Sequence, residues 1–302
     1  MSNIKSPSFT IIEAYKLMGY FAEQALSKQS TNSSAYFQEQ LRTYMRSVLA
    51  NIDSSLTKIA ESWVLSQTTE SELEKLPEMV NLAENSKTKQ LVNQVLVKCM
   101  DTVKLTNINP RIVLILGDGN NETLTQAMQN AIGVSLGNKI SLLFFWPQHQ
   151  WKDSLSFAVA HEYSHLCQNS YVEKHFVDGK MISGKTGRPD TLLDAVLNEG
   201  ISDAFATSIQ PSFTPNWIHP LPIQQETLVW EAMAELLHSE DPMIIRSFLA
   251  GSTPTLPDWA GQYLGYKIVT QFIINNPSTH FEDLYTLDSE FIYNNSGYKP
   301  GL

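Results

Sequence analysis

The spacing of apolar residues predicts a helical N-terminal segment over residues 1–105. Between Phe9 and Met100, apolar residues recur every three or four positions, which is the period of an amphipathic helix. One stretch begins at Ile11, a second begins at Tyr36 and continues through residues 52–64, and a third runs from about residue 87 to Met100. This N-terminal region contains no cluster of His, Cys and carboxylate residues in its sequence. We therefore assign it to packing or to shaping a substrate site.

After Pro110 the pattern changes to that of short strands. Residues 111–116 form an apolar, β-branched run that ends at Gly117-Asp118-Gly119-Asn120, which predicts a buried strand and a turn. Residues 131–136 and 139–145 flank Gly137-Asn138, a two-residue hairpin signal. A short helix over residues 124–130 is expected before this hairpin. A sheet is therefore predicted over residues 111–146.

From Asp153 onward the helical period returns. Helices are predicted over residues 153–168 and 191–209, with a polar segment between them, and Pro189-Asp190-Thr191 supplies a start for the second. A helical C-terminal subdomain is expected over residues 222–302. Together these elements predict an α+β fold, mostly helical, in which a small mixed sheet packs on two helices within a domain over residues 106–302.

Composition and charge narrow the classes of function. The 302 residues carry a formal net charge of −10, which argues against binding to a nucleic acid backbone. No apolar run approaches the roughly 20 residues that would span a membrane, and the first residues lack the pattern of a secretory signal. Two cysteines, Cys99 and Cys167, cannot build a disulfide framework. We therefore expect a cytoplasmic protein.

The residues that indicate chemistry are His161-Glu162-x-x-His165, in the first of the two predicted helices. Residues four apart project from one face of a helix, so both imidazoles can reach the same tetrahedral metal ion. The glutamate between them leans toward the same side, as in zinc hydrolases. Such a site needs a third protein ligand and leaves one position for water.

The helix predicted over residues 191–209 offers that ligand. Glu199 and Asp203 are four residues apart and share a face. Glu199 can complete a His₂Glu set, while Asp203 can accept the free ring N–H of a ligating histidine and fix its tautomer. These ligand types favour Zn²⁺, and we predict one ion per chain.

The two elements resemble the gluzincin pattern of zinc peptidases. The segment Asn198-Glu199-Gly200-Ile201-Ser202-Asp203 is similar to the Asn-Glu-Ala-x-Ser-Asp of thermolysin-like peptidases, although 33 residues separate His165 from Glu199, more than in those enzymes. With Leu192-Leu193-Asp194 and Gly261-Gln262-Tyr263-Leu264-Gly265-Tyr266, the chain most resembles a group of bacterial proteins predicted to be zinc-dependent proteases. The resemblance covers about Arg111 to Phe281.

This resemblance implies a zincin-like fold and a peptide or protein substrate. It implies that His161, His165 and Glu199 bind zinc and that Glu162 acts as general base. Gluzincins stabilise the oxyanion with a Tyr or His from a later helix, for which the candidates here are Tyr263, Tyr266, His219 and His238; we favour the two tyrosines, which open an apolar helix. Zincins also pair an edge strand with the substrate, and the strand at 139–145 is expected in that role.

Other interpretations stay open. A zinc-stabilised regulatory or binding protein with little or no turnover would carry the same ligands, and a helical interaction protein could carry the motif by coincidence. His175 is an alternative third ligand, although its polar surroundings favour a solvated loop. Asp194 could cap a helix or face solvent. The tryptophans, including Trp217, are assigned to the core or to the wall of a pocket.

Overall fold

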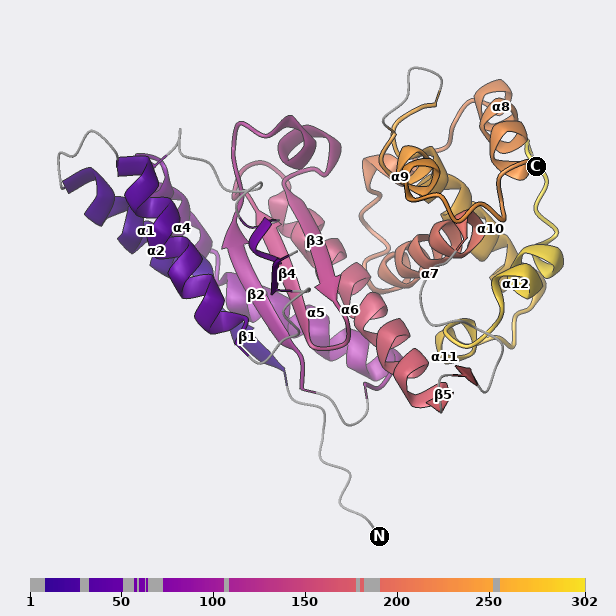
Figure 1. Cartoon of the computed structure of the whole chain (residues 1–302), viewed down its shortest axis with the longest axis horizontal. Coiled ribbons are helices and arrows are strands. Elements are labelled where there is room, and N and C mark those ends of the chain that lie inside the picture. Colours follow the sequence, from indigo (N-terminus) through magenta and orange to yellow (C-terminus); the bar gives the residue numbers. More distant parts are fainter. Residues whose placement is uncertain are drawn as a thin grey trace, which may run out of the picture. The chain divides into compact units, whose positions relative to one another are not determined.

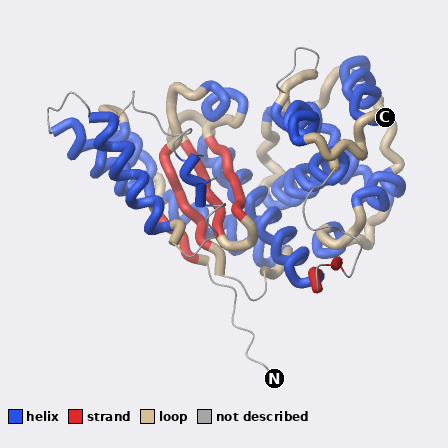
Figure 2. The backbone as a smooth tube through the Cα atoms, viewed as in Figure 1, coloured by secondary structure: helices blue, strands red, loops and turns tan. Residues whose placement is uncertain are grey.

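The structure is a computed structural model, drawn in Figure 1 and, by secondary structure, in Figure 2. It describes residues 9–27, 33–50, 57–58, 60–62, 64, 73–105, 109–177, 180–181, 191–251 and 256–301. By its contacts the chain divides into two compact units, Met1–Leu166 and Cys167–Leu302. The domain boundary near residue 105 stays a prediction.

The first unit is built on a small mixed sheet (Figure 2). Its strands are β1 (Thr10–Ile12), β2 (Arg111–Leu116), β3 (Ala131–Leu136) and β4 (Ile140–Phe145), in the order β1-β2-β4-β3. β2 is parallel to β1 and β4, whereas β3 is antiparallel to β4. The hairpin turns at Gly137, whose φ of 59° is one that glycine adopts without strain. The three strands predicted from the sequence are confirmed.

Two predictions about this sheet were wrong. The residues from Ile11 were expected to start a helix, but Thr10–Ile12 is β1, because these β-branched residues pair with β2. The strand at 139–145 was expected to be the edge that binds substrate. It is β4, which lies between β2 and β3 and has both edges paired. Within the part of the chain that the structure describes, the outermost strand on that side of the sheet is β3.

Helices surround this sheet. They are α1 (Ala14–Ser27), α2 (Ser33–Val48), α4 (Leu76–Asn85), α5 (Thr88–Thr102), the π-helix η1 (Thr123–Ala127) and the first part of α6 (Trp151–His175). The helix predicted from about residue 87 is confirmed as α5, and η1 stands where a short helix was expected. α4 was not predicted, and most of the continuation expected over residues 52–64 lies outside the described residues.

The second unit is mostly helical and contains the end of α6. It also has two short strands, β5 (Phe176–Val177) and β6 (Lys180–Met181). Its helices are α7 (Leu192–Ile209), η2 (Asn216–Ile218), α8 (Ile223–Ala234), α9 (Pro242–Ala250), α10 (Ala260–Asn275), α11 (Phe281–Leu284) and α12 (Ser289–Ser296). α7 begins at Thr191 through a capping box with Asp194. The start predicted at Thr191 is thus confirmed, while residues 189–190 lie outside the described part.

α7 packs closely against α10. A Cβ atom on Gly200 would lie 2.3 Å from the carbonyl oxygen of Gly265, and one on Gly265 would lie 2.0 Å from that of Val196. Only glycine permits such an approach, so these two positions bring the backbones of the helices together. The α+β fold class with a small mixed sheet is confirmed. In the part of the chain that the structure describes, no helix is long and apolar enough to cross a membrane.

Candidate metal centre

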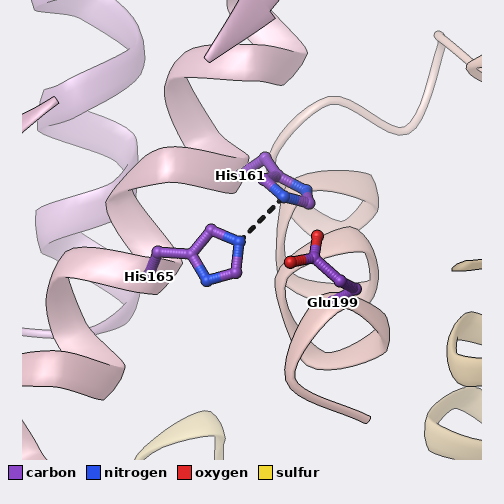
Figure 3. Close-up of side chains that lie close together, drawn as sticks. All are labelled: His161, His165 and Glu199. Carbon is purple, nitrogen blue, oxygen red and sulfur yellow. Dashed lines mark hydrogen bonds between the residues drawn. The ribbon is translucent and has the colours of Figure 1, made fainter. Parts of the chain in front are cut away.

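Helix α6 presents His161 and His165 on one face, as the four-residue spacing requires (Figure 3). The Nε2 atoms of the two rings lie 3.0 Å apart. A tetrahedral zinc ion holds two imidazole nitrogens about 3.3 Å apart, given Zn–N bonds of ~2.0–2.1 Å. The two rings are therefore already arranged much as a shared metal ion would hold them.

Glu199 of α7 lies close to the two histidines. Figure 3 shows its carboxylate turned toward the two imidazoles, and ligand atoms of His161, His165 and Glu199 lie within 4.8 Å of one another. All three side chains are half-buried. Two neutral nitrogen donors and one carboxylate are the donor set of a His₂Glu catalytic zinc site, so the residues present fit the metal that the motif implies.

α6 and α7 are joined beside these ligands by Gln168, one turn after His165. Its side-chain amide donates to the carbonyl oxygen of Asn198 at 3.2 Å and to the Ser202 hydroxyl at 2.9 Å. Gln168 is 5% exposed, so these hydrogen bonds are shielded from water. Because Asn198 directly precedes Glu199, the contact fixes on α6 the turn of α7 that carries Glu199. Sequence reasoning missed this residue.

Glu162 points away from solvent, with only 4% of its surface exposed. Its side chain lies over Gly133 of β3, and the hydroxyl of Ser135 donates to its backbone carbonyl at 3.1 Å. The Oε2 atom is buried and has no hydrogen-bond partner among the described residues. A buried carboxylate oxygen without a partner is uncommon and is typical of functional positions.

Asp203 lies one turn after Glu199 and is fully buried. The indole N–H of Trp217 points at its carboxylate, 3.1 Å from Oδ1 and 3.2 Å from Oδ2. A buried carboxylate is stabilised by such a donor. Trp217 was expected to have no role beyond packing, and nothing in the local sequence indicates its partner, which is 14 residues away.

The candidates for oxyanion stabilisation lie in different settings. Tyr263 is buried and donates to Glu226 Oε2 at 3.0 Å, and burial, together with the charge of Glu226, raises its pKa to about 12. Tyr266 is half-buried on α10, where its backbone nitrogen is close to Gly200, and no described residue hydrogen-bonds its hydroxyl. His219 is exposed, and His238, 79% exposed, pairs with Glu290 at 3.3 Å.

Two of the remaining sequence alternatives are located by the backbone. His175 is the last residue of α6 and not part of a loop, and α6 is accordingly longer than the predicted 153–168; the His175 side chain lies outside the described part. Asp194, for which capping or exposure had been left open, accepts from the Thr191 backbone at 3.1 Å and caps α7. Asp194 therefore acts in starting the helix that carries Glu199.

Comparison with protein families places the site in context. Residues 88–294, well over half of the chain, match the family described as "Predicted Zn-dependent protease (DUF2268)". The chain belongs to this family. The matched region begins at α5 and includes α6, α7 and α10, while α1, α2 and α4 precede it. Comparison with curated proteins and with solved structures finds no match.

Membership agrees with the resemblance drawn from the motifs, which covered a narrower range of residues. The family description names both zinc and proteolysis, and the cluster of His161, His165 and Glu199 is compatible with a zinc ion. The two helices that carry this cluster lie inside the matched region.

Proposed function

We propose that the protein is a zinc-dependent peptidase of the gluzincin type, with a zincin-like catalytic domain. One Zn²⁺ per chain would be held by His161, His165 and Glu199. The observation that carries this proposal is the convergence of these three side chains from α6 and α7, because nothing in the pattern of apolar residues requires it. The family's description supports the choice of metal and reaction.

A bound zinc ion would act as a Lewis acid that lowers the pKa of the attacking water and polarises the carbonyl group of the peptide bond. Glu162 takes a proton from the attacking water and returns it to the leaving amine as the peptide bond breaks. Its buried Oε2 atom, which no described residue hydrogen-bonds, is available to do so. The surrounding low-dielectric environment strengthens each electrostatic interaction of that carboxylate.

We assign stabilisation of the oxyanion to Tyr266 in preference to Tyr263. The hydroxyl of Tyr263 already donates to Glu226, and a proton in that bond is unavailable to a substrate. Tyr266 follows Gly265, which packs on α7 one turn from Glu199, and its hydroxyl is free of partners among the described residues. Asp203 is proposed to orient a ligating imidazole.

The peptide or protein substrate is proposed to bind along β3. Among the described residues, β3 pairs only with β4, and an extended peptide can add to an unpaired strand edge through main-chain hydrogen bonds. β3 also lies against Glu162 at Gly133, which brings the docking strand and the base together. A cytoplasmic location, suggested by a chain with two cysteines in all, remains a prediction.

A zinc-stabilised binding or regulatory protein with little turnover is the second candidate. It is favoured by the burial of Glu162, since a closed site would exclude substrate. Bound zinc with no peptidase activity would support it over the peptidase.

The deciding experiment measures bound zinc and hydrolysis of a quenched peptide library. The parent should bind one zinc ion and cleave peptides. Glu162→Gln should keep the metal and lose activity by roughly a hundredfold or more, whereas His161→Ala should lose both. A parent that binds no zinc under any loading condition would end the proposal. A parent that keeps zinc but cleaves nothing would leave only the second candidate.

A further inference from the structure

We propose that Gly133 and Ser135, neighbouring residues on one face of β3, position the side chain and backbone of Glu162. This inference rests on the proposed function, in which Glu162 is the base. Residues two apart in a strand face the same side, so Gly133 and Ser135 both face α6. Neither is a metal ligand, and we assign them the role of holding the base in place.

Gly133 provides the space that Glu162 occupies. A Cβ atom at position 133 would lie 2.3 Å from Glu162 Cγ and 2.6 Å from Oε1. Two carbon atoms that are not bonded do not approach so closely. Cγ is the nearer atom, and it cannot move aside unless the Glu162 side chain changes its rotamer. Any residue larger than glycine would therefore turn the carboxylate to a new direction. A glycine inside a strand often marks such a close approach.

Ser135 holds the backbone of the same residue. Its hydroxyl donates to the Glu162 carbonyl at 3.1 Å and lies 2.7 Å from the hydroxyl of Ser141 on the paired strand β4. Because Ser135 has one hydroxyl proton and gives it to the carbonyl, Ser141 is the donor in the second bond. Ser141 is fully buried. The relay from Ser141 through Ser135 thus ties the helix to the hairpin at Glu162.

The two contacts act on different parts of one residue. Backbone and side chain are both located by β3, yet neither Gly133 nor Ser135 donates a hydrogen bond to the carboxylate. Oε2 consequently stays buried with no partner among the described residues. A base held by shape in this way keeps its lone pairs for a proton, which is the benefit of preorganisation.

The first test is a double-mutant cycle on thermal stability, which needs neither zinc nor activity as a readout. Gly133→Ala should lower Tm in the parent background but much less in Glu162→Ala, where the conflicting side chain is gone. Gly19→Ala is the matched control, because its Cβ would lie 2.9 Å from Val80 in the same unit. Its effect should be equal in both backgrounds. The inference would be overturned if Gly133→Ala lowered Tm equally in the two backgrounds. It would also be overturned if Gly133→Ala prevented folding both in the parent and in Glu162→Ala.

The second test separates positioning from metal binding. Gly133→Ala should keep the zinc dissociation constant of the parent and lower kcat by roughly a hundredfold, with KM little changed. Ser135→Ala should do the same to a smaller extent, and Gly19→Ala should retain the parent's activity. Unchanged kcat in Gly133→Ala beside an active parent would contradict the inference alone. An inactive parent would contradict the proposed function, while the stability cycle would still test the contact.

Discussion

At the scale of single residues, Asp203 and Trp217 lead to a prediction about the proposed metal site. Asp203 is fully buried, and its carboxylate accepts a hydrogen bond from the indole N–H of Trp217 at 3.1 Å. A carboxylate in this setting can hold a ligating imidazole in one tautomer, and loss of such support typically weakens metal affinity. Trp217 in turn fixes where the carboxylate of Asp203 points.

Asp203→Asn should therefore weaken zinc binding by roughly 10–100-fold, because an amide accepts more weakly than a carboxylate. Trp217→Phe keeps the packing of an aromatic ring and removes only the donor, so its effect should have the same sign and be smaller. Competition with a chelating indicator measures both dissociation constants. Affinities equal to that of the parent would show that Asp203 acts in folding and not on the ligands.

The sequence was sufficient to select the three residues of the candidate cluster, but not the residues that contact them. The shared face of His161 and His165 follows from their helical spacing, and Glu199, on a second helix, was selected by its residue type and motif; the three ligand groups lie together in the structure. Gly133 carried a weak signal, a glycine within a strand, whose meaning depends on the α6 side chain above it. Trp217 carried none, since its partner is set by the path of the chain between α7 and η2.

At the scale of elements, the same distinction applies to the sheet. The strands of the hairpin could be predicted from local alternation and from Gly137-Asn138. Their neighbours could not, because the placement of β4 between β2 and β3 depends on residues 20 or more positions away. The outermost position in the sheet was therefore assigned to the wrong strand of a correctly predicted pair.

The pairing of α6 with α7 leads to a prediction about Gln168. Gln168→Met keeps the length of the side chain and removes the donors to Asn198 and Ser202. The half-buried carbonyl of Asn198 and the buried hydroxyl of Ser202 then each lose a donor, which should lower the free energy of unfolding by about 1–3 kcal/mol. Zinc affinity should fall by roughly tenfold as Glu199 loses its fixed position.

Thr207→Val is the control for Gln168→Met. Thr207 is on α7, and its buried hydroxyl has no hydrogen-bond partner among the described residues. The substitution therefore breaks no hydrogen bond between described residues. Its zinc affinity should equal that of the parent. Titration with zinc and denaturant unfolding measure the two effects separately, and a loss of stability without a loss of affinity would restrict Gln168 to a packing role.

At the scale of the whole molecule, a buried carboxylate ties the C-terminal residues to helices α8 and α10. Glu226 of α8 is 2% exposed and accepts from Lys267 at 2.7 Å, Tyr298 at 2.9 Å and Tyr263 at 3.0 Å, and from the backbone N–H of Gly301 at 3.3 Å. Helices α8 and α10 and the residues after α12 thus converge on one charge. These donors satisfy the oxygens of a group that burial alone would disfavour.

This network makes stability depend on pH. Burial by itself raises the pKa of Glu226, but the bonds from Lys267, Tyr298, Gly301 and Tyr263 outweigh it and hold the pKa below the ordinary value of 4.5. The unfolded chain then binds a proton more readily than the folded chain does. The stabilisation is present above the unfolded pKa and is lost as the pH falls through the lower folded pKa.

Glu226→Gln should consequently lower the free energy of unfolding at pH 7 by about 3 kcal/mol, because Lys267 loses its partner in a largely buried setting. The loss should shrink below pH 4.5, where the parent also begins to protonate this group. Denaturant unfolding of both proteins from pH 7 to pH 3 measures the difference directly. Because α10 carries Tyr266, the variant should also lose peptidase activity at pH 7 while retaining zinc. A difference in stability that is constant over this range would mean that the charge of Glu226 does not hold these elements together.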